Sequence, residues 1–237
     1  MKSSLQYGTK TIEYIVTYRE RKTLEISVEP PNIVSVVAPT GTTDEKVSAY
    51  VKKKADWIVQ KIFLFKDMEY RKIHRQLVNG ESLLYLGRNY TLQLIDDFSL
   101  KKPIVSLFQG KFYIKTPTRD VQLLQKVMVD WYKQKALQRI TERSNYYQHY
   151  FKRKPTAVKV KEQQKRWGSC TTNNELLFNW RSIMAPSYIL DYIIVHEMCH
   201  LYYMNHSQEF WDLLNTIMPD YEQRKEWLKN NGVKLDL

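Results

Sequence analysis

The segment His196-Glu197-Met198-Cys199-His200 is the strongest indication of the fold in this sequence. Its two histidines are four residues apart, so on a helix they project from one face, one turn apart, and can share one tetrahedral cation. Glu197 flanks the same edge, where it can take a proton from a water molecule that the cation has made more acidic. The motif therefore predicts a helix that carries a catalytic metal, with Glu197 as general base.

The residues around this motif are apolar on nearly every side of the helix, which predicts that the helix is buried. An alternative is that His196 and His200 are core histidines satisfied by hydrogen bonds, and that Glu197 pairs with a lysine or arginine. Each buried polar group left unpaired would then cost about 1 to 3 kcal/mol. One cation removes this cost for all three groups, so we favour a metal. The apolar residues are Ile189, Leu190, Ile193, Ile194, Val195, Met198 and Leu201.

His206 is the candidate third ligand, because a catalytic zinc usually takes three protein ligands and leaves one position for water. If the helix continued, residue 206 would lie about 120° around from His200 and about 9 Å along the axis, too far to share the ion. The helix must therefore end first. Asn205 tolerates the left-handed conformation that ends helices, and Ser207 is a good N-cap for a following helix. The alternative is that His206 is an ordinary loop histidine before that helix.

Other polar residues have weaker claims to the metal. Glu209 is a less favoured ligand, and an equally good hydrogen-bond acceptor for a histidine N–H. Cys199 is expected to be a small buried apolar group. Cys170 and Cys199 are the two cysteines, too few for a disulfide framework, and both are expected to be reduced. His74 and His149, in charged or tyrosine-rich surroundings, are expected to be surface or structural histidines.

Length and composition bound the class of protein. With 237 residues, 43% of them hydrophobic, the chain can form one large domain or two small ones with a buried core. The N-terminus lacks the apolar segment of a signal peptide, and no apolar run approaches the roughly 20 residues that cross a bilayer. We therefore expect a cytoplasmic protein without a membrane partner. The formal charge of +12 could serve nucleic acid or an acidic partner, although solvated faces explain most basic runs.

Alternating apolar and polar residues organise the first half of the chain. Residues 11–39 predict three strands, with antiparallel pairing favoured, and residues 43–75 have the spacing of one long helix. A change of pattern near residue 117 places the domain boundary there, between a β-rich region at 1–117 and a domain at 118–237. No internal repeat is evident. Short β-type segments predict a second small sheet around residues 82–86, 90–95, 104–108 and 112–115.

The second half is expected to be mainly helical around a small β region. Residues 118–152 predict a second long amphipathic helix. Residues 157–161 and 176–180 predict strands that flank the loop Arg166-Trp167-Gly168-Ser169-Cys170. Pro186 suits the first turn of the helix that carries the histidines.

Several motifs, taken in order, resemble the YgjP-like metallopeptidases, relatives of the SprT and Spartan proteases. They cover about 50 residues, whereas the first half of the chain matches only in general layout. The spacing from His200 to His206 is also that of the metzincins, but Tyr203 stands where they have glycine, so that label is not carried over. The motifs are Arg166-Trp167-Gly168-Ser169-Cys170, Phe178-Asn179-Trp180, Ala185-Pro186, Asp191 to His200, Asn205-His206-Ser207 and Phe210-Trp211.

The resemblance implies an α+β fold with a zincin-like catalytic domain. A sheet would lie over the metal-binding helix, and the helix at 118–152 would back it. The resemblance also implies one Zn²⁺ per chain, held by His196, His200 and His206, and a protein or peptide as substrate. A place beside DNA metabolism is a further implication.

The loop from Arg166 to Cys170 has two interpretations. It can be a wall of the cleft, where Gly168 lets a substrate backbone approach and a neighbouring strand pairs with an extended peptide. Alternatively, Trp167 and Cys170 pack beneath the metal-binding helix. Arg166, Tyr202 and Tyr203 are the candidates for stabilising an oxyanion.

Together these observations predict a zinc-dependent metallopeptidase. Zinc would polarise the peptide carbonyl and the water, and Glu197 would take the proton and deliver it to the leaving amine. The alternative is a zinc-stabilised binding module for nucleic acid that uses the +12 charge, with proteolysis absent or vestigial. The two can coexist in a protease recruited to DNA or to a DNA-bound protein.

Overall fold

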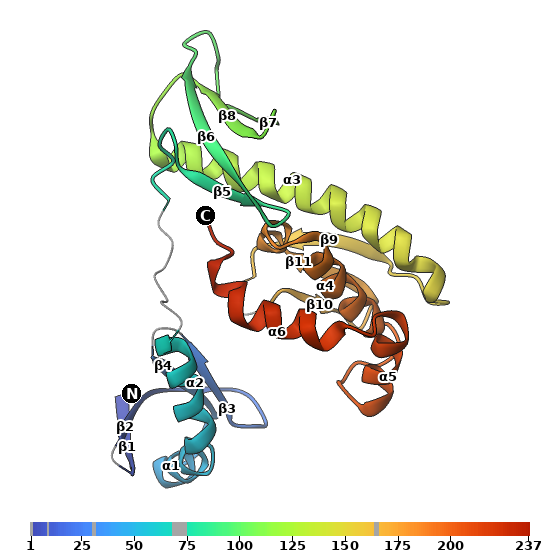
Figure 1. Ribbon diagram of the computed structural model, residues 1–237. Coiled ribbons are helices and arrows are strands. Elements are labelled where there is room, and N and C mark those ends of the chain that lie inside the picture. The colour runs from blue at the N-terminus through green and yellow to red at the C-terminus, as the bar shows by residue number, and fades with distance from the viewer. Residues whose placement is uncertain (1, 9, 30–31, 68–74, 164–165) are drawn as a thin grey trace. The chain divides into compact units, whose positions relative to one another are not determined.

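The structure is a computed structural model that describes residues 2–8, 10–29, 32–67, 75–163 and 166–237. The chain divides into two compact units, Met1–Lys72 and Ile73–Leu237, coloured blue to cyan and green to red in Figure 1. In the described ranges, the helices are all too short or too polar to cross a membrane. Residues 68–74 of the predicted helix, His74 among them, lie outside the described residues.

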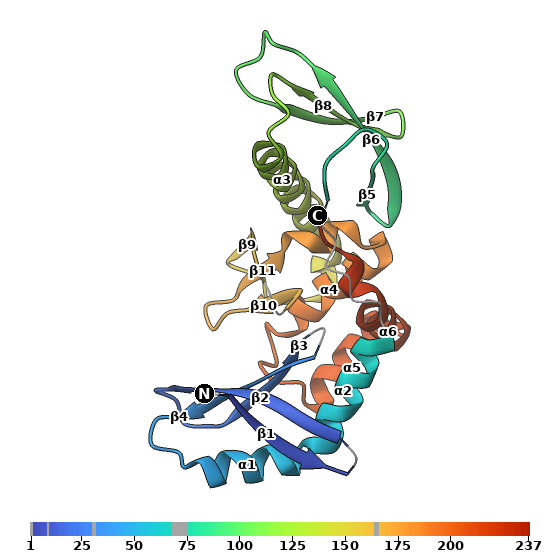
Figure 2. The ribbon, with the colours of Figure 1, turned by 90° about the vertical axis from the view of Figure 1, so that its left-hand side faces the viewer.

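The first unit is a four-stranded sheet followed by two helices (Figure 2). The strand order is β1-β2-β4-β3, in which β2 and β4 run parallel and the two outer pairs are antiparallel. The predicted antiparallel pairing is therefore wrong for β2 and β4. The parallel register places Tyr14 beside Val34 and Val16 beside Val36, so the buried residues of both strands share one face. The elements are β1 (Lys2–Tyr7), β2 (Lys10–Arg19), β3 (Glu25–Glu29), β4 (Ile33–Pro39), α1 (Asp44–Lys53) and α2 (Ala55–Asp67).

Lys54 interrupts the single helix predicted for residues 43–75. Its backbone N–H is shared between the carbonyls of Tyr50 and Val51, at 3.3 and 3.1 Å, a bifurcated pattern that is common at helix ends. The buried residues on the two sides of the break keep the spacing of one continuous apolar face. The spacing of apolar residues therefore predicted the buried face correctly but did not indicate the break at Lys54. These buried residues are Val47, Val51, Ala55 and Ile58.

The second unit begins with another four-stranded sheet, which confirms the predicted β segments. Its order is β5-β6-β8-β7, with β6 and β8 parallel and the outer pairs antiparallel. This pairing scheme repeats that of the first unit, and a helix follows each sheet, a repetition of topology that the sequence does not reveal. The elements are β5 (Ser82–Tyr85), β6 (Arg88–Asp96), β7 (Ile104–Phe108), β8 (Lys111–Thr116) and α3 (Val121–Tyr147), which a short 3₁₀ turn, η1 (Gln148–Tyr150), extends.

The predicted boundary at residue 117 differs from the division between Lys72 and Ile73. The second sheet and α3 share one core, because the Phe112 ring packs edge-on against Trp131 at 4.9 Å. The Tyr132 hydroxyl also donates a hydrogen bond of 2.7 Å to the carbonyl of Leu84. The change of pattern near residue 117 is the passage from strands to a helix within one unit.

A third sheet lies against the helix that carries the histidines. Its order is β10-β11-β9, and β10, an edge strand, occupies part of the segment predicted as a loop. Helix α4 contacts α3, β10, α5 and α6, so it lies at the centre of this unit. The elements are β9 (Ala157–Lys161), β10 (Gly168–Cys170), β11 (Glu175–Asn179), η2 (Trp180–Met184), α4 (Ser187–Cys199), α5 (Gln208–Ile217), α6 (Tyr221–Asn231) and η3 (Gly232–Lys234).

The tip of the β5–β6 hairpin supports the start of α4. Backbone N–H groups of Leu86 and Gly87 donate to the carbonyls of Ile183 and Met184 at 2.9 and 3.0 Å. Gly87 has a φ of 77°, and a Cβ at this position would lie 2.8 Å from the Cα of Pro186, the N-cap of α4. Only glycine fits this turn without strain.

A partly buried ion pair joins α3 to α4. Arg143 donates hydrogen bonds of 2.7 and 2.8 Å to the Asp191 carboxylate, and the Tyr147 hydroxyl donates a third at 3.2 Å. Asp191 is 9% exposed. Breaking such a pair leaves an uncompensated charge in the interior. We expect Asp191→Asn to lower the free energy of unfolding by about 3 kcal/mol, measured by urea denaturation of the metal-free chain.

The exposed pair of Arg119 and Asp96 offers a matched control, because it has two hydrogen bonds of 2.7 Å in the same fork geometry. Water screens both of its charges, so Asp96→Asn should change stability little. Equal losses in the two variants would contradict the role assigned to burial.

Candidate metal centre

Helix α4 carries His196 and Glu197, and His200 is its C-cap. The helix therefore ends before residue 206, as predicted. The chain continues through the loop at residues 201–207 and enters α5 at Gln208. This loop returns His206 to the face of α4 that carries the other two histidines.

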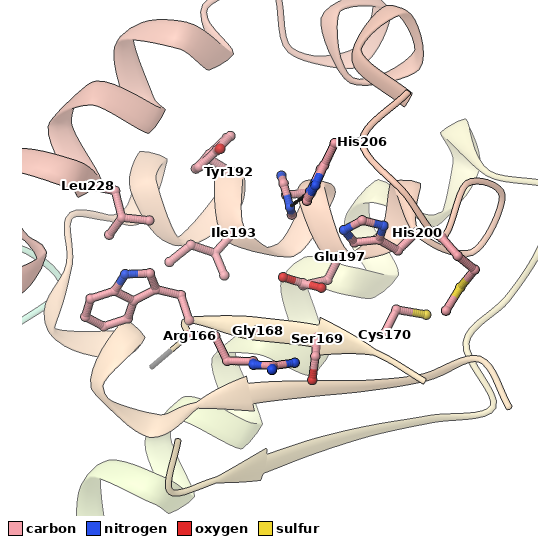
Figure 3. Close-up of a pocket in the computed structure, with 13 residues that line it drawn as sticks. Arg166, Gly168, Ser169, Cys170, Tyr192, Ile193, Glu197, His200, His206 and Leu228 are labelled. Carbon is pink, nitrogen blue, oxygen red and sulfur yellow. Dashed lines mark hydrogen bonds between the residues drawn. The ribbon is translucent and has the colours of Figure 1, made fainter. Parts of the chain in front are cut away.

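The three histidines converge on one point. Each offers a ring nitrogen, and these nitrogens all lie within 4.8 Å of one another. His206 Nε2 is 3.0 Å from His196 Nε2, the contact dashed in Figure 3. Two neutral imidazole nitrogens that face each other at this distance repel unless a proton or a cation lies between them.

The surroundings of these rings fit a metal ion. His200 Nδ1 lies 2.8 Å from the carbonyl oxygen of Tyr203, so this nitrogen carries the proton and leaves Nε2 with its lone pair. Burial, together with the neighbouring His200 and His206, lowers the pKa of His196 to about 3, which keeps that imidazole neutral. Neutral imidazole is the form that binds zinc. The donor set is therefore of the right chemistry.

Glu197 is the acid group nearest to this point, and it is 5% exposed. Its Oε2 has no hydrogen-bond partner among the residues that the structure describes. Burial raises the pKa of Glu197 to about 8, and the charge of Arg166 partly opposes that shift. Figure 3 shows the carboxylate between α4 and the strand that carries Gly168. A free acceptor oxygen thus lies beside the histidines.

Gly168 makes room for this carboxylate. A Cβ at residue 168 would lie 2.6 Å from Glu197 Cγ, 2.7 Å from Oε1 and 2.8 Å from Cδ, closer than real Cβ atoms come to other heavy atoms. The sequence suggested that Gly168 admits a substrate backbone. The structure adds a reason that the sequence does not reveal, because any side chain here would displace Glu197.

The segment before β10 is anchored by Asn179. Its Nδ2 donates to the carbonyls of Gln163 and Arg166 at 2.7 and 3.3 Å, and its backbone N–H donates to the carbonyl of Trp167 at 2.8 Å. A Cβ at Gly232 would lie 2.8 Å from the Trp167 ring, so this ring packs closely on the end of α6. These contacts fix the backbone that positions Gly168.

A pocket of about 460 Å³ opens over the histidines and Glu197. The segment from Arg166 to Cys170 lines one wall, and the Trp167 ring both lines the pocket and packs against Gly232 at the end of α6. Tyr192 is not among the site residues predicted from the sequence. It lies one helical turn before His196, and the centroids of the two rings are 5.8 Å apart. The remaining lining residues are Ile193, Met204 and Leu228.

Several candidate residues lie outside this lining. The Tyr202 hydroxyl accepts a hydrogen bond of 2.8 Å from the backbone N–H of Arg153, and Tyr203 contributes its carbonyl to His200. Glu209 is exposed and interacts with Ser207 at the start of α5. Of the three candidates for an oxyanion donor, Arg166 is the one that lines the pocket.

The remaining histidine that the structure describes and the two cysteines have separate environments. His149 is exposed, and its Nδ1 lies 2.8 Å from the carbonyl of Tyr146. Cys170 and Cys199 are both free thiols. Cys199 is fully buried, and its burial, with the nearby Glu197 charge, raises the pKa of its thiol to about 12.

A comparison with models of protein families matches residues 22–231 to the YgjP-like metallopeptidase domain. The chain belongs to the YgjP-like metallopeptidase family. The predicted resemblance is thus confirmed, and the YgjP-like match extends from the second unit well into the first, beyond the motifs that suggested it. It includes all three histidines and Glu197.

This YgjP-like chain was also compared with curated proteins and with solved structures. No curated protein matches it. Among solved structures, it is similar to the crystal structure of the metallopeptidase zymogen of Pyrococcus abyssi abylysin, with 17% sequence identity and a TM-score of 0.36. That similarity covers 40% of this chain and 94% of the other.

Proposed function

We propose that this protein is a zinc-dependent peptidase of the zincin type, whose zinc is held by His196, His200 and His206. The observation that carries the proposal is the convergence of three histidine nitrogens beside the buried Oε2 of Glu197, which has no hydrogen-bond partner in the described part of the chain. Three imidazoles with one position left open are typical of a catalytic zinc. When bound, the cation would supply Lewis acidity toward a peptide carbonyl and toward water.

Glu197 acts as the general base in this proposal. Its free Oε2 accepts a proton from the water that attacks the peptide carbonyl carbon. The same carboxyl group then donates that proton to the leaving nitrogen as the C–N bond breaks. Gly168 and the buried environment hold the carboxylate in one place, so little rearrangement is needed between the two transfers.

The pocket wall supplies groups that fit a peptide. Strand β10 is an edge strand that pairs with β11 on one side, so an extended peptide can add hydrogen bonds along its other edge. Arg166 lines the pocket and lies close enough to Glu197 to affect its pKa, so we assign its guanidinium to the developing negative charge on the substrate oxygen. The whole site lies within Ile73–Leu237, which we propose as the catalytic unit.

The substrate class in this proposal is a protein or peptide, because the family to which the chain belongs is one of metallopeptidases. The formal charge of +12 suggested nucleic acid as a second partner. The alternative function, nucleic-acid binding with vestigial proteolysis, predicts a protein that holds zinc but cleaves no peptide.

The test is a metal analysis joined to a peptidase assay. We expect about one zinc per chain in the wild-type protein and a loss of stoichiometric zinc in His206→Ala, because two histidines alone hold zinc weakly. Chelation should abolish cleavage of an unfolded protein substrate, and added zinc should restore it. His149→Ala, which removes an exposed histidine with its own backbone contact, is the matched control and should keep both zinc and activity.

Two results would contradict the proposal in different ways. Stoichiometric zinc in His206→Ala would remove His206 from the ligand set. Stoichiometric zinc in a wild-type protein that cleaves no unfolded protein or peptide would favour the zinc-stabilised binding module instead.

A further inference from the structure

His206 has less support from secondary structure than the other two histidines. It is exposed and lies on the loop between α4 and α5, whereas His196 lies within α4 and His200 at its end. A side chain on such a loop loses rotational freedom when it binds an ion, and this loss weakens binding unless the side chain is already held. The affinity of the centre therefore depends on what holds the His206 ring.

Trp211 packs flat against His206. The two ring centroids are 5.4 Å apart with an interplanar angle of 23°. Trp211 in turn stacks on Tyr221, with centroids 5.5 Å apart and an angle of 22°, and the Lys225 ammonium lies 4.4 Å from its ring centroid. Tyr221 and Lys225 belong to α6, so a second helix holds the tryptophan against the loop histidine.

Phe210, the neighbour of Trp211 on α5, supports the centre from the buried side. Its ring centroid lies 4.9 Å from that of His196, 4.6 Å from that of His200 and 4.7 Å from that of His206. Phe210 is fully buried, whereas Trp211 is half-buried. A change at Trp211 therefore disturbs the His206 ring with less damage to the core.

We propose that Trp211, held by Tyr221 and Lys225, is a positioning residue that fixes the His206 ring for metal binding and so sets the affinity of the centre for its cation. The inference rests on the proposed metal centre. The stack restricts the His206 ring before the cation arrives, so less conformational entropy is lost on binding. Groups that orient metal ligands typically change metal affinity by about 10-fold to 100-fold when they are removed.

The test measures Zn²⁺ affinity of the full chain by competition with a chromophoric chelator, with circular dichroism of the metal-free protein as the folding check. We expect Trp211→Leu to bind Zn²⁺ about 10-fold to 100-fold more weakly, and Trp211→Phe, which keeps a stacking ring, to recover part of the loss. Trp227→Leu is the matched control. Trp227 is also a half-buried tryptophan, but it packs against Tyr188 and lies outside the pocket lining, so its loss should leave affinity unchanged.

A double-mutant cycle separates positioning of His206 from a general effect on the fold. His206→Ala lacks the ring that Trp211 holds, so in this background Trp211→Leu should cause no further loss of the weak Zn²⁺ affinity that the other two histidines provide, measured at higher Zn²⁺ concentration. An equal loss in both backgrounds would overturn the proposal.

The remaining outcomes also decide the matter. If the wild-type chain binds no Zn²⁺, the metal centre itself is wrong. If it binds Zn²⁺ and Trp211→Leu binds it equally well, the metal centre stands and the positioning role is overturned. If Trp211→Leu does not fold, Trp211→Phe and Tyr221→Leu replace it, and wild-type affinity in both would overturn the proposal.

Discussion

Replacing Glu197 by glutamine is expected to lower kcat/KM for peptide hydrolysis by about 100-fold to 10,000-fold, the usual contribution of a general base. The amide has the shape of the carboxylate and fits the same space against Gly168, but it cannot accept a proton from water. The histidines are untouched, so the variant should still bind one zinc. Steady-state kinetics on a peptide substrate, with metal analysis of the same samples, measure both effects.

The chain offers a matched control for this substitution. Glu209 is exposed, interacts with Ser207 and lies outside the pocket lining, so Glu209→Gln should have the kinetics of the wild type. A wild-type rate in Glu197→Gln would remove Glu197 from the mechanism. Loss of zinc from Glu197→Gln would instead show that this carboxylate holds the metal.

The second large effect is expected from Gly168→Ala. The added methyl group would lie 2.6 to 2.8 Å from three atoms of the Glu197 side chain, so the carboxylate has to move. A misplacement of about 1 Å in a reacting group costs about 100-fold in rate, and we expect a fall of that size in kcat/KM. Zinc affinity should stay close to that of the wild type, because the three atoms nearest to the methyl group all belong to Glu197.

Measuring the effect of Gly168→Ala on kcat/KM in a Glu197→Asp variant tests whether Gly168 acts through Glu197. The shorter side chain withdraws the atoms that the methyl group would meet, so Gly168→Ala should cost much less activity there than in the wild type. An equal fall in both backgrounds would mean that the glycine serves the substrate backbone instead, as the sequence suggested.

The motif from His196 to His200 could be recognised in the sequence because its geometry is local. The spacing of His196 and His200 by four residues places them on one face of any helix, whatever surrounds it. The argument that the helix must end before His206 is also local, since it depends on helical rise and rotation alone. The structure ends α4 at Cys199, in agreement with that argument.

The environment of the motif could not be read in the same way. The contact between Gly168 and Glu197 joins an edge strand to a helix, and Leu228 reaches the pocket from α6. Such contacts join residues far apart in the chain, and periodicity carries no information about which elements meet. Phe210 was recognisable as an apolar residue of a helix, but its contact with all three histidine rings was not.

The predicted domain boundary differs from the division between Lys72 and Ile73 for a related reason. Near residue 117 the pattern changes from strands to a helix, and a local pattern records only that change. A unit is defined by a shared core. Phe112 precedes residue 117 and Trp131 follows it, but the two rings pack against each other, so both belong to one core. Likewise, the alternation of apolar and polar residues identified the buried faces of β2 and β4 but not their parallel pairing. That pairing arises because β3 lies on the outer side of β4 and not between β2 and β4.

The helix that carries the histidines, the candidate ligands and general base, and the family could all be predicted from the residues alone. Each of these depends on spacing along a few turns of chain or on motifs in order. The surroundings of the site became visible in the folded chain: the glycine that makes room for the Glu197 carboxylate, the stack of Trp211 and Tyr221 behind His206, and the division into units with separate cores. These features arise from packing between distant segments, which depends on the shape of the whole folded unit.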